Sequence, residues 1–85
     1  MPYYAALLHM IDTEKNKETR PFHIDYLDEL DKQGKIYARG PFSDGSGGLV
    51  VYIADTFEEA HLLAEKDPHV IEKARRLELK EWQVV

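Results

Sequence analysis

The chain has 85 residues, no cysteine, and a formal net charge of −5 from 16 acidic and 11 basic side chains. This length allows one domain, residues 1–85, whose core is only marginally sufficient and which no disulfide can stabilise. An acidic chain argues against nucleic-acid binding, which requires basic side chains to neutralise phosphates. The one basic cluster, Lys73, Arg75 and Arg76, is interpreted as a solvated surface because acidic residues flank it. With no signal peptide and no apolar run long enough to cross a membrane, we expect a cytoplasmic protein.

The first strand is expected over residues 3–11, where apolar residues occupy both odd and even positions. A strand with one face in water alternates apolar and polar residues. This pattern therefore predicts a strand that is covered on both sides. A polar loop is expected to follow it over residues 12–19.

The first helix is expected over residues 20–33. Thr19 suits the N-cap, Pro21 suits the first turn, and Gly34 can take the left-handed conformation that ends a helix. His23 points into the middle of the apolar arc at helical spacing, which Tyr26, Leu27 and Leu30 form. Such a histidine is either a hydrogen-bonded core residue or an acid–base residue, because a buried charge requires a partner.

The second strand is expected over residues 35–40 and the third over residues 49–54. The glycine-rich segment between them, Ser43 to Gly48, is either a flexible hairpin or a loop at the rim of a ligand cleft. It lacks the pattern of a phosphate-binding loop. Arg39, next to Gly40, either binds a substrate carboxylate with two hydrogen bonds or lies at the surface.

The second helix is expected to begin at the capping box formed by Thr56 and Glu59. Pro68 is expected to end it, because the residue before a proline disfavours helical geometry. Asp67 then faces inward at the end of this helix, either as an ordinary Asp-Pro stop or as part of a site. The last strand, residues 76–85, changes the parity of its apolar residues, which predicts a bulge or a crossing to another subunit.

The predicted order is strand, helix, strand, strand, helix, strand, which is the ferredoxin-like α+β arrangement with a four-stranded antiparallel sheet. Two helices can cover one face of this sheet, whereas the strands expected at its centre are apolar on both faces. We therefore expect a homodimer in which two sheets pack face to face.

Both helices are expected on one face of the sheet, and each carries one inward ionisable side chain, His23 or Asp67. A carboxylate near an imidazole orients the ring and favours its charged form. Such a pair can act as a general base and then as a general acid. The histidines lack metal-binding spacing, so we expect no metal, and we expect no organic cofactor.

The ordered set of Arg20-x-x-His23, Gly34, Gly40-Pro41-Phe42, Asp67-Pro68 and a final tryptophan strand resembles the YciI-like (YCII-related) family of the dimeric α+β barrel superfamily. The resemblance covers nearly the whole chain. It implies a ferredoxin-like fold, dimerisation, and an active site centred on a histidine and an aspartate, which correspond to His23 and Asp67. Some relatives are dechlorinating or lactone-handling enzymes. The chain departs from the family beside the aspartate, with His69 in place of an aromatic residue and with Glu72 and Lys73 where glycine is usual.

The leading hypothesis is a cofactor-independent enzyme that acts on a small, anionic or aromatic substrate by isomerisation, by a dehydrochlorinase-like elimination, or by lactone chemistry. In this hypothesis His23 is the acid and base, and Asp67 orients it. The substrate would be held by Arg20 or Arg39, beside Gly40 and Pro41. The alternative is a non-catalytic metabolite-binding or protein-interaction domain in which the His/Asp pair is structural.

Overall fold

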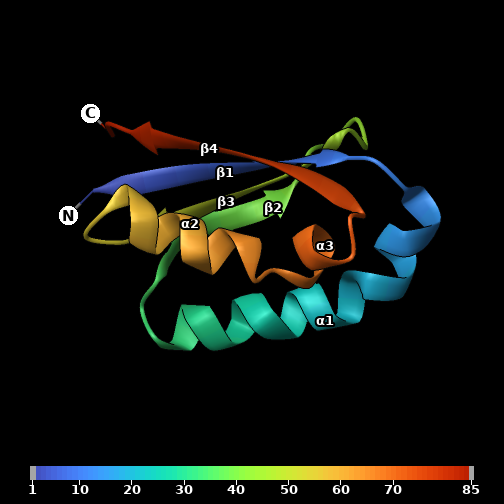
Figure 1. The fold of residues 1–85 in the computed structure, drawn as a ribbon, viewed down its shortest axis with the longest axis horizontal. Helices are drawn as coiled ribbons and strands as arrows, with labels where there is room; N and C mark the ends of the chain where they lie inside the picture. The colour runs from blue at the N-terminus through green and yellow to red at the C-terminus, as the bar shows by residue number, and fades with distance from the viewer. Residues whose placement is uncertain (1, 85) are drawn as a thin grey trace.

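The structure, a computed structural model, describes residues 2–84. Its elements follow in the order β1 (Tyr3–Met10), α1 (Thr13–Lys32), β2 (Ile36–Pro41), β3 (Gly47–Ile53), α2 (Phe57–Glu65), α3 (Pro68–Ile71) and β4 (Arg75–Trp82). The strands form one antiparallel sheet in the order β2-β3-β1-β4, so β1 and β3 lie at its centre as predicted. This is the ferredoxin-like α+β fold (Figure 1). None of the helices in residues 2–84 is long and apolar enough to span a bilayer.

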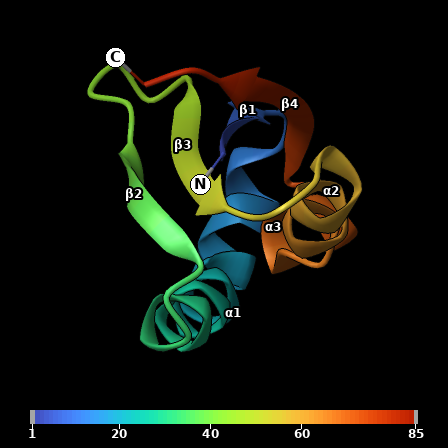
Figure 2. The ribbon, with the colours of Figure 1, turned by 90° about the vertical axis from the view of Figure 1, so that its left-hand side faces the viewer.

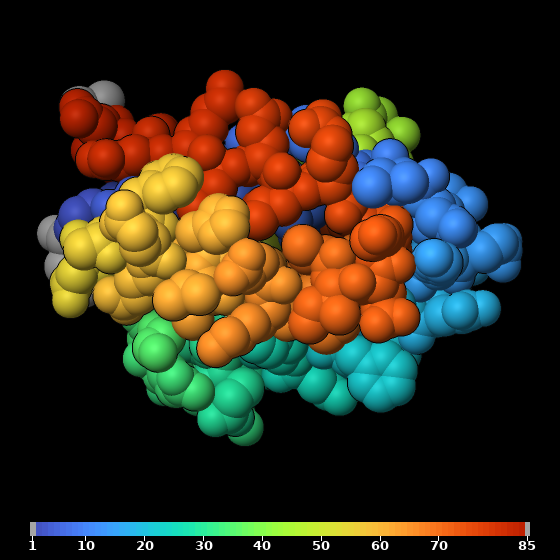
Figure 3. All heavy atoms as spheres, in the orientation of Figure 1, coloured from blue at the N-terminus to red at the C-terminus, as the bar shows by residue number. Residues whose placement is uncertain are grey.

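The three helices lie on the same face of the sheet (Figure 2). The space-filling view shows α2 and α3 closing the layer between β4 and α1 (Figure 3). Burial of apolar surface between the helices and the sheet forms the core, which includes Ala6, Leu8, Leu27, Leu30, Val50, Tyr52 and Ala64. The opposite face of the sheet is not covered by any helix of residues 2–84, and its side chains on β1 are half-buried: Tyr3, Ala5 and Leu7.

Helix α1 begins at Thr13, so the expected loop over residues 12–19 is wrong. Asp12 is the N-cap, and its side chain accepts hydrogen bonds from the amides of Glu14 and Lys15, both at 3.1 Å. The expected N-cap, Thr19, lies inside the helix, as does Pro21. The first two turns project polar side chains into solvent, so they carry none of the apolar periodicity that marks a packed helix.

Thr56 is confirmed as the N-cap of α2, because its hydroxyl accepts a hydrogen bond from the amide of Glu59 at 3.1 Å. The other half of the expected box differs, since the Glu59 carboxylate accepts from the amide of Asp55 at 3.4 Å rather than from that of Thr56. The expected end of this helix before Pro68 is confirmed, since α2 ends at Glu65 and Asp67 has an extended backbone. The sequence interpretation missed that Pro68 also begins the short helix α3, with Asp67 as the N-cap. Proline suits the first position of a helix because its missing N–H would have no partner there. Asp67 therefore lies at the junction of two helices.

Strand β4 pairs with β1 without a break, from Met10 opposite Arg75 to Tyr3 opposite Trp82, so the expected bulge in this strand is wrong. The register shift lies in β2. The inward side chains of β4 include Leu77 and Leu79, which pack against the core. The outward Trp82 packs beside Tyr37 with ring centroids 6.4 Å apart. The apolar residues of β4 change from odd to even positions because Leu77 and Leu79 lie on the covered face of the sheet and Trp82 lies on the uncovered face. The end of the predicted strand, Val85, lies outside the described residues.

Candidate functional site

His23 and Asp67 are in direct contact. The Nδ1 atom of His23 lies 2.7 Å from Oδ1 and 2.9 Å from Oδ2 of the Asp67 carboxylate. The imidazole is 7% exposed and the carboxylate is fully buried. A carboxylate accepts hydrogen bonds, so Nδ1 carries the hydrogen. The Nε2 atom makes no hydrogen bond within residues 2–84 and is therefore the ring nitrogen available for proton transfer.

Asp67 is held from several directions. Its Oδ1 atom also accepts a hydrogen bond from the amide of His69 at 2.9 Å, and its backbone carbonyl accepts from the amides of Val70 and Ile71. The same carboxylate thus caps α3 and orients the imidazole. Burial, and next the negative charge of Asp67, raise the pKa of Tyr26 to about 12. Since the Tyr26 hydroxyl donates to the carbonyl of Leu63 at 2.6 Å, it is a neutral structural group.

A second imidazole, that of His69, lies against the first. The rings of His23 and His69 are stacked with centroids 4.1 Å apart, and His69 is fully buried. Thr19 donates its hydroxyl hydrogen to the carbonyl of Lys15 at 2.8 Å, so the Nδ1–H of His69 donates to the Thr19 oxygen at 2.7 Å. Burial, and next the field of His23, lower the pKa of His69 to about 4. His69 is therefore a neutral wall of the site.

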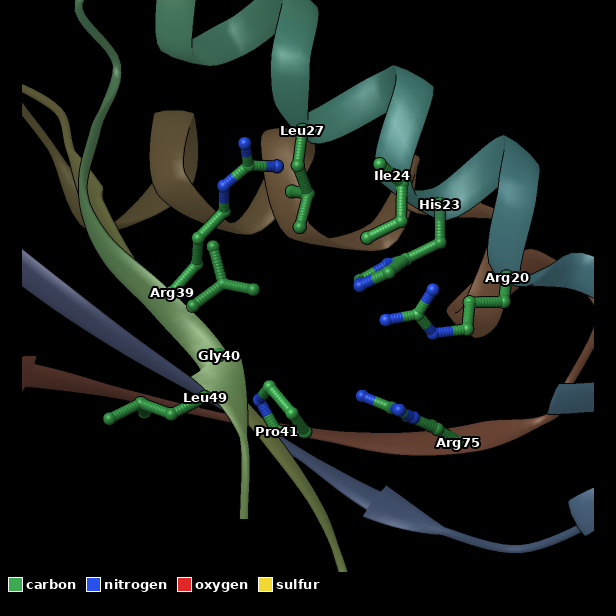
Figure 4. Close-up of a pocket in the computed structure, with 10 residues that line it drawn as sticks. Arg20, His23, Ile24, Leu27, Arg39, Gly40, Pro41, Leu49 and Arg75 are labelled. Carbon is green, nitrogen blue, oxygen red and sulfur yellow. The ribbon is translucent and has the colours of Figure 1, made fainter. Parts of the chain in front are cut away.

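A cavity of about 240 Å³ opens in front of the His23 ring. The predicted residues Arg20, His23, Arg39, Gly40 and Pro41 all line it, together with Ile24, Leu27, Leu49, Val50 and Arg75. In Figure 4 the imidazole of His23 and the guanidinium groups of Arg20 and Arg75 point into one space. The site thus combines a tethered imidazole, two cationic side chains and an apolar wall.

Arg39 occupies the other end of this cavity. Its side chain turns toward α1 and lies beside Leu27 (Figure 4). Its Nη2 atom donates to the carboxylate of Asp28 at 2.6 Å, and Asp31 lies 3.5 Å away. The charge of this arginine is therefore balanced by two carboxylates of α1.

Arg75 is a site residue that the sequence interpretation missed. It was assigned to a solvated cluster, yet it is 9% exposed and lines the cavity. It shares the inward face of β4 with Leu77 and Leu79, and this parity was the signal that could have found it. A Cβ atom at Gly48 would come within 2.9 Å of Nη1 of Arg75, so the glycine leaves room for the guanidinium.

Within residues 2–84 no group of three or more His, Cys, Asp or Glu side chains is arranged to hold a metal ion.

Comparison with known proteins places the chain among relatives of similar length. Residues 2–83 match the YCII-related domain. The chain is also 38% identical over 82 residues to the uncharacterized protein YjpA of Bacillus subtilis (strain 168), covering 95% of this chain and 96% of YjpA. The chain belongs to the YCII-related family. The family inferred from the ordered motifs is thereby confirmed.

A solved structure with the same fold comes from an enzyme. This YCII-related chain is similar, with a TM-score of 0.79, to 5-chloro-2-hydroxyhydroquinone dehydrochlorinase (TftG) from Burkholderia phenoliruptrix AC1100, solved in complex with 2,5-dihydroxybenzoquinone. The match covers 98% of this chain and 94% of TftG at 19% sequence identity. At this identity the similarity shows a shared fold.

Proposed function

We propose that this YCII-related protein is a small-molecule enzyme in which His23 transfers a proton and Asp67 orients it. The observation that supports the proposal most strongly is the contact of these two side chains next to a cavity of about 240 Å³. A buried carboxylate that holds Nδ1 fixes the imidazole in one orientation and one tautomer. The opposite nitrogen, Nε2, then acts as general base and general acid.

The substrate is a small anionic or aromatic molecule that undergoes proton movement. In an elimination, Nε2 takes a proton from carbon, the electron pair of that bond forms a double bond, and the leaving group departs with its own pair. In an isomerisation or a lactone reaction, the same nitrogen returns the proton to another atom. The similarity to a dehydrochlorinase that was solved with 2,5-dihydroxybenzoquinone supports a small planar substrate.

We assign roles to the other predicted residues from their positions in the cavity. Arg20 holds the anionic group of the substrate, since its guanidinium points into the cavity (Figure 4). Gly40 and Pro41 form the side of the cavity that belongs to β2. Arg39 closes the far end while its charge is balanced by Asp28.

The test is turnover by His23→Ala. Wild-type protein is incubated with 5-chloro-2-hydroxyhydroquinone, with chloride release as the readout, and with a panel of small lactones. On any compound that wild-type protein converts, we expect His23→Ala to be about 10²–10⁴-fold slower, because it loses the acid–base group. His61→Ala is the matched control, since this histidine is exposed on α2. Full activity of His23→Ala would show that the acid–base assignment is wrong.

The alternative function is metabolite binding without catalysis. It is favoured by the burial of the His23–Asp67 pair, because buried histidine–carboxylate pairs also serve structure alone. A compound that binds the wild-type protein and is recovered unchanged, across the whole panel, would favour this second function.

We also propose that two copies associate through the uncovered face of the sheet. This face carries Leu7 at its centre and an aromatic group at one end, formed by Tyr3, Tyr37 and Trp82. Tyr37 and Trp82 are 51% and 43% exposed. Contiguous exposed apolar surface on a small domain marks an interaction site, and a second sheet of the same shape would bury it.

A further inference from the structure

We infer that Arg75 anchors the ligand of this site and that Arg75 and Arg20 together select a compact, planar carboxylate. The inference rests on the proposed function and adds to it the class of ligand and the residue that binds its charge.

Arg75 is a buried cation with no carboxylate of residues 2–84 in direct contact. Burial lowers its pKa, and the charge of Asp67 opposes this effect from a distance, while the Asp67 carboxylate itself binds His23. Arg75 is 9% exposed, and within residues 2–84 it forms no ion pair. Its Nε atom donates to the Oδ1 atom of Asn16 at 2.8 Å, which is a neutral partner. Burying a charged group is costly unless an opposite charge or several hydrogen bonds compensate it. Of the three arginines that line this cavity, Arg39 alone forms ion pairs within residues 2–84, with two carboxylates of α1.

The free part of the Arg75 side chain faces the cavity. With Nε bound to Asn16, the two terminal nitrogens remain, and Figure 4 shows them directed into the space between Pro41 and Arg20. These nitrogens form the fork that binds a carboxylate with two parallel hydrogen bonds. The side chain of Asn16 holds the guanidinium in position, and Gly48 leaves room for it because it has no side chain.

Arg20 adds a second cation on the other side of the same space. Its guanidinium comes from α1, whereas that of Arg75 comes from β4, so an anion between them contacts both elements (Figure 4). Between these arginines and Arg39 at the other end, the cavity is bounded by the apolar side chains of Ile24, Leu27 and Val50. A carboxylate between the arginines therefore places a flat apolar body along this wall and in front of His23.

Benzoate is the probe for this inference, and benzamide is its neutral control of nearly the same shape. Binding is measured by isothermal titration calorimetry at neutral pH. Wild-type protein is expected to bind benzoate and not benzamide. Arg75→Gln and Arg20→Gln are each expected to weaken benzoate binding about 10- to 100-fold, because each loses hydrogen bonds to a charged group. Arg76→Gln is the matched control, since the adjacent residue points to the opposite face of β4 and is exposed.

Two further variants separate anchoring from folding. Arg75→Lys keeps the charge and loses the fork, so we expect binding weaker than wild type and tighter than Arg75→Gln. Arg20 is exposed on α1, so Arg20→Gln should keep the wild-type thermal midpoint whatever Arg75→Gln does. The inference is overturned if Arg20→Gln binds benzoate like the wild type, if Arg75→Lys does so, or if wild-type protein shows no saturable benzoate binding at millimolar concentration.

His23→Ala distinguishes this inference from the proposed function. The charges of the anchor belong to Arg75 and Arg20, so His23→Ala should still bind benzoate saturably and more tightly than Arg75→Gln does. Retained binding together with retained turnover would contradict the acid–base role and leave the anchor in place. Wild-type-like benzoate binding by Arg75→Lys and by Arg20→Gln would contradict the anchor and leave the acid–base role in place.

Discussion

The two stacked imidazoles of the site differ in what surrounds them. His23 has a carboxylate on one nitrogen and the cavity near the other, whereas His69 is fully buried and its Nε2 atom has no hydrogen-bond partner among residues 2–84. Burial, and next the field of His23, hold the pKa of His69 near 4, so this ring stays neutral while a proton moves on its neighbour. A neutral aromatic face also contacts a cationic imidazole favourably.

The buried neutral His69 predicts a pH-dependent stability. Its pKa is about 4 in the folded protein against 6.5 for an unperturbed histidine. Between these values the unfolded chain binds a proton that the folded chain does not, so the free energy of unfolding decreases as the pH falls from about 6.5 toward 4. His69→Phe removes this contribution and keeps a ring stacked on His23.

Urea unfolding of both proteins at pH 7 and pH 4.5 measures the effect. The wild type should lose on the order of 2–3 kcal/mol more than His69→Phe between these two values. Protein concentration is held constant, because self-association would shift the apparent stability. Equal losses in the two proteins would contradict a depressed pKa at His69.

The sequence predicted the direction in which His23 projects from its helix, but not its distance from Asp67. A helical wheel gives the side of a helix from which a residue projects, but it does not tell how two helices are aligned along the sheet. The contact with Asp67 depends on that alignment. Arg75 was missed because the predicted strand began one residue late, and a strand residue has an assigned face only once its strand has been recognised.

The helices show why some elements were predicted with wrong bounds. The capping box at Thr56 was recognisable because cap and apolar stripe agree. Helix α1 begins after its cap, Asp12, with turns of polar residues that pack against little of the protein. These turns show no apolar periodicity, so the start of the helix could be predicted from capping and helix propensity alone. The Asp67-Pro68 pair ends one helix and also begins the next, and the sequence predicted the first role only, because α3 is stabilised by its packing against α1.

Two glycines on neighbouring strands, Gly40 of β2 and Gly47 of β3, are expected to differ sharply in how well they tolerate a side chain. A Cβ atom at Gly47 would overlap the backbone carbonyl of Leu8, and the φ angle of +142° is one that L residues rarely adopt. Gly47→Ala should therefore lower the free energy of unfolding by more than about 2 kcal/mol. Gly40→Ala is the control, because nothing lies within 4 Å of its Cβ position, and it should change stability by less than about 1 kcal/mol. Equal effects in chemical denaturation would contradict a close approach of β1 at Gly47.

For the whole molecule, the packing of the helices on one face of the sheet could be predicted from the sequence. The homodimer remains a prediction. The order of the strands followed from two apolar central segments and a split βαβ pattern. The same pattern indicates that the second face of the sheet needs a cover, since the outward residues Leu49 and Ile53 on β3 are apolar and only partly buried.

The oligomeric state tests this cover directly. By sedimentation velocity at micromolar concentration, the wild type should run as a dimer. Leu7→Glu places a charge at the centre of the uncovered face, where burial against a second sheet would desolvate it, so this variant should run as a monomer. Phe22→Glu is the control, because Phe22 is 64% exposed on the helical side and should leave the dimer intact. A monomeric wild type would exclude the proposed assembly.

The tether between Nδ1 and both oxygens of Asp67 has a stereochemical consequence. A ring fixed at one nitrogen exchanges hydrogen with a ligand through the other nitrogen alone, so abstraction and return occur on the same side of the molecule. An isomerisation in this cavity is then suprafacial. Part of a deuterium label should travel from one carbon of the substrate to the next, because the imidazole can hand it back before water replaces it.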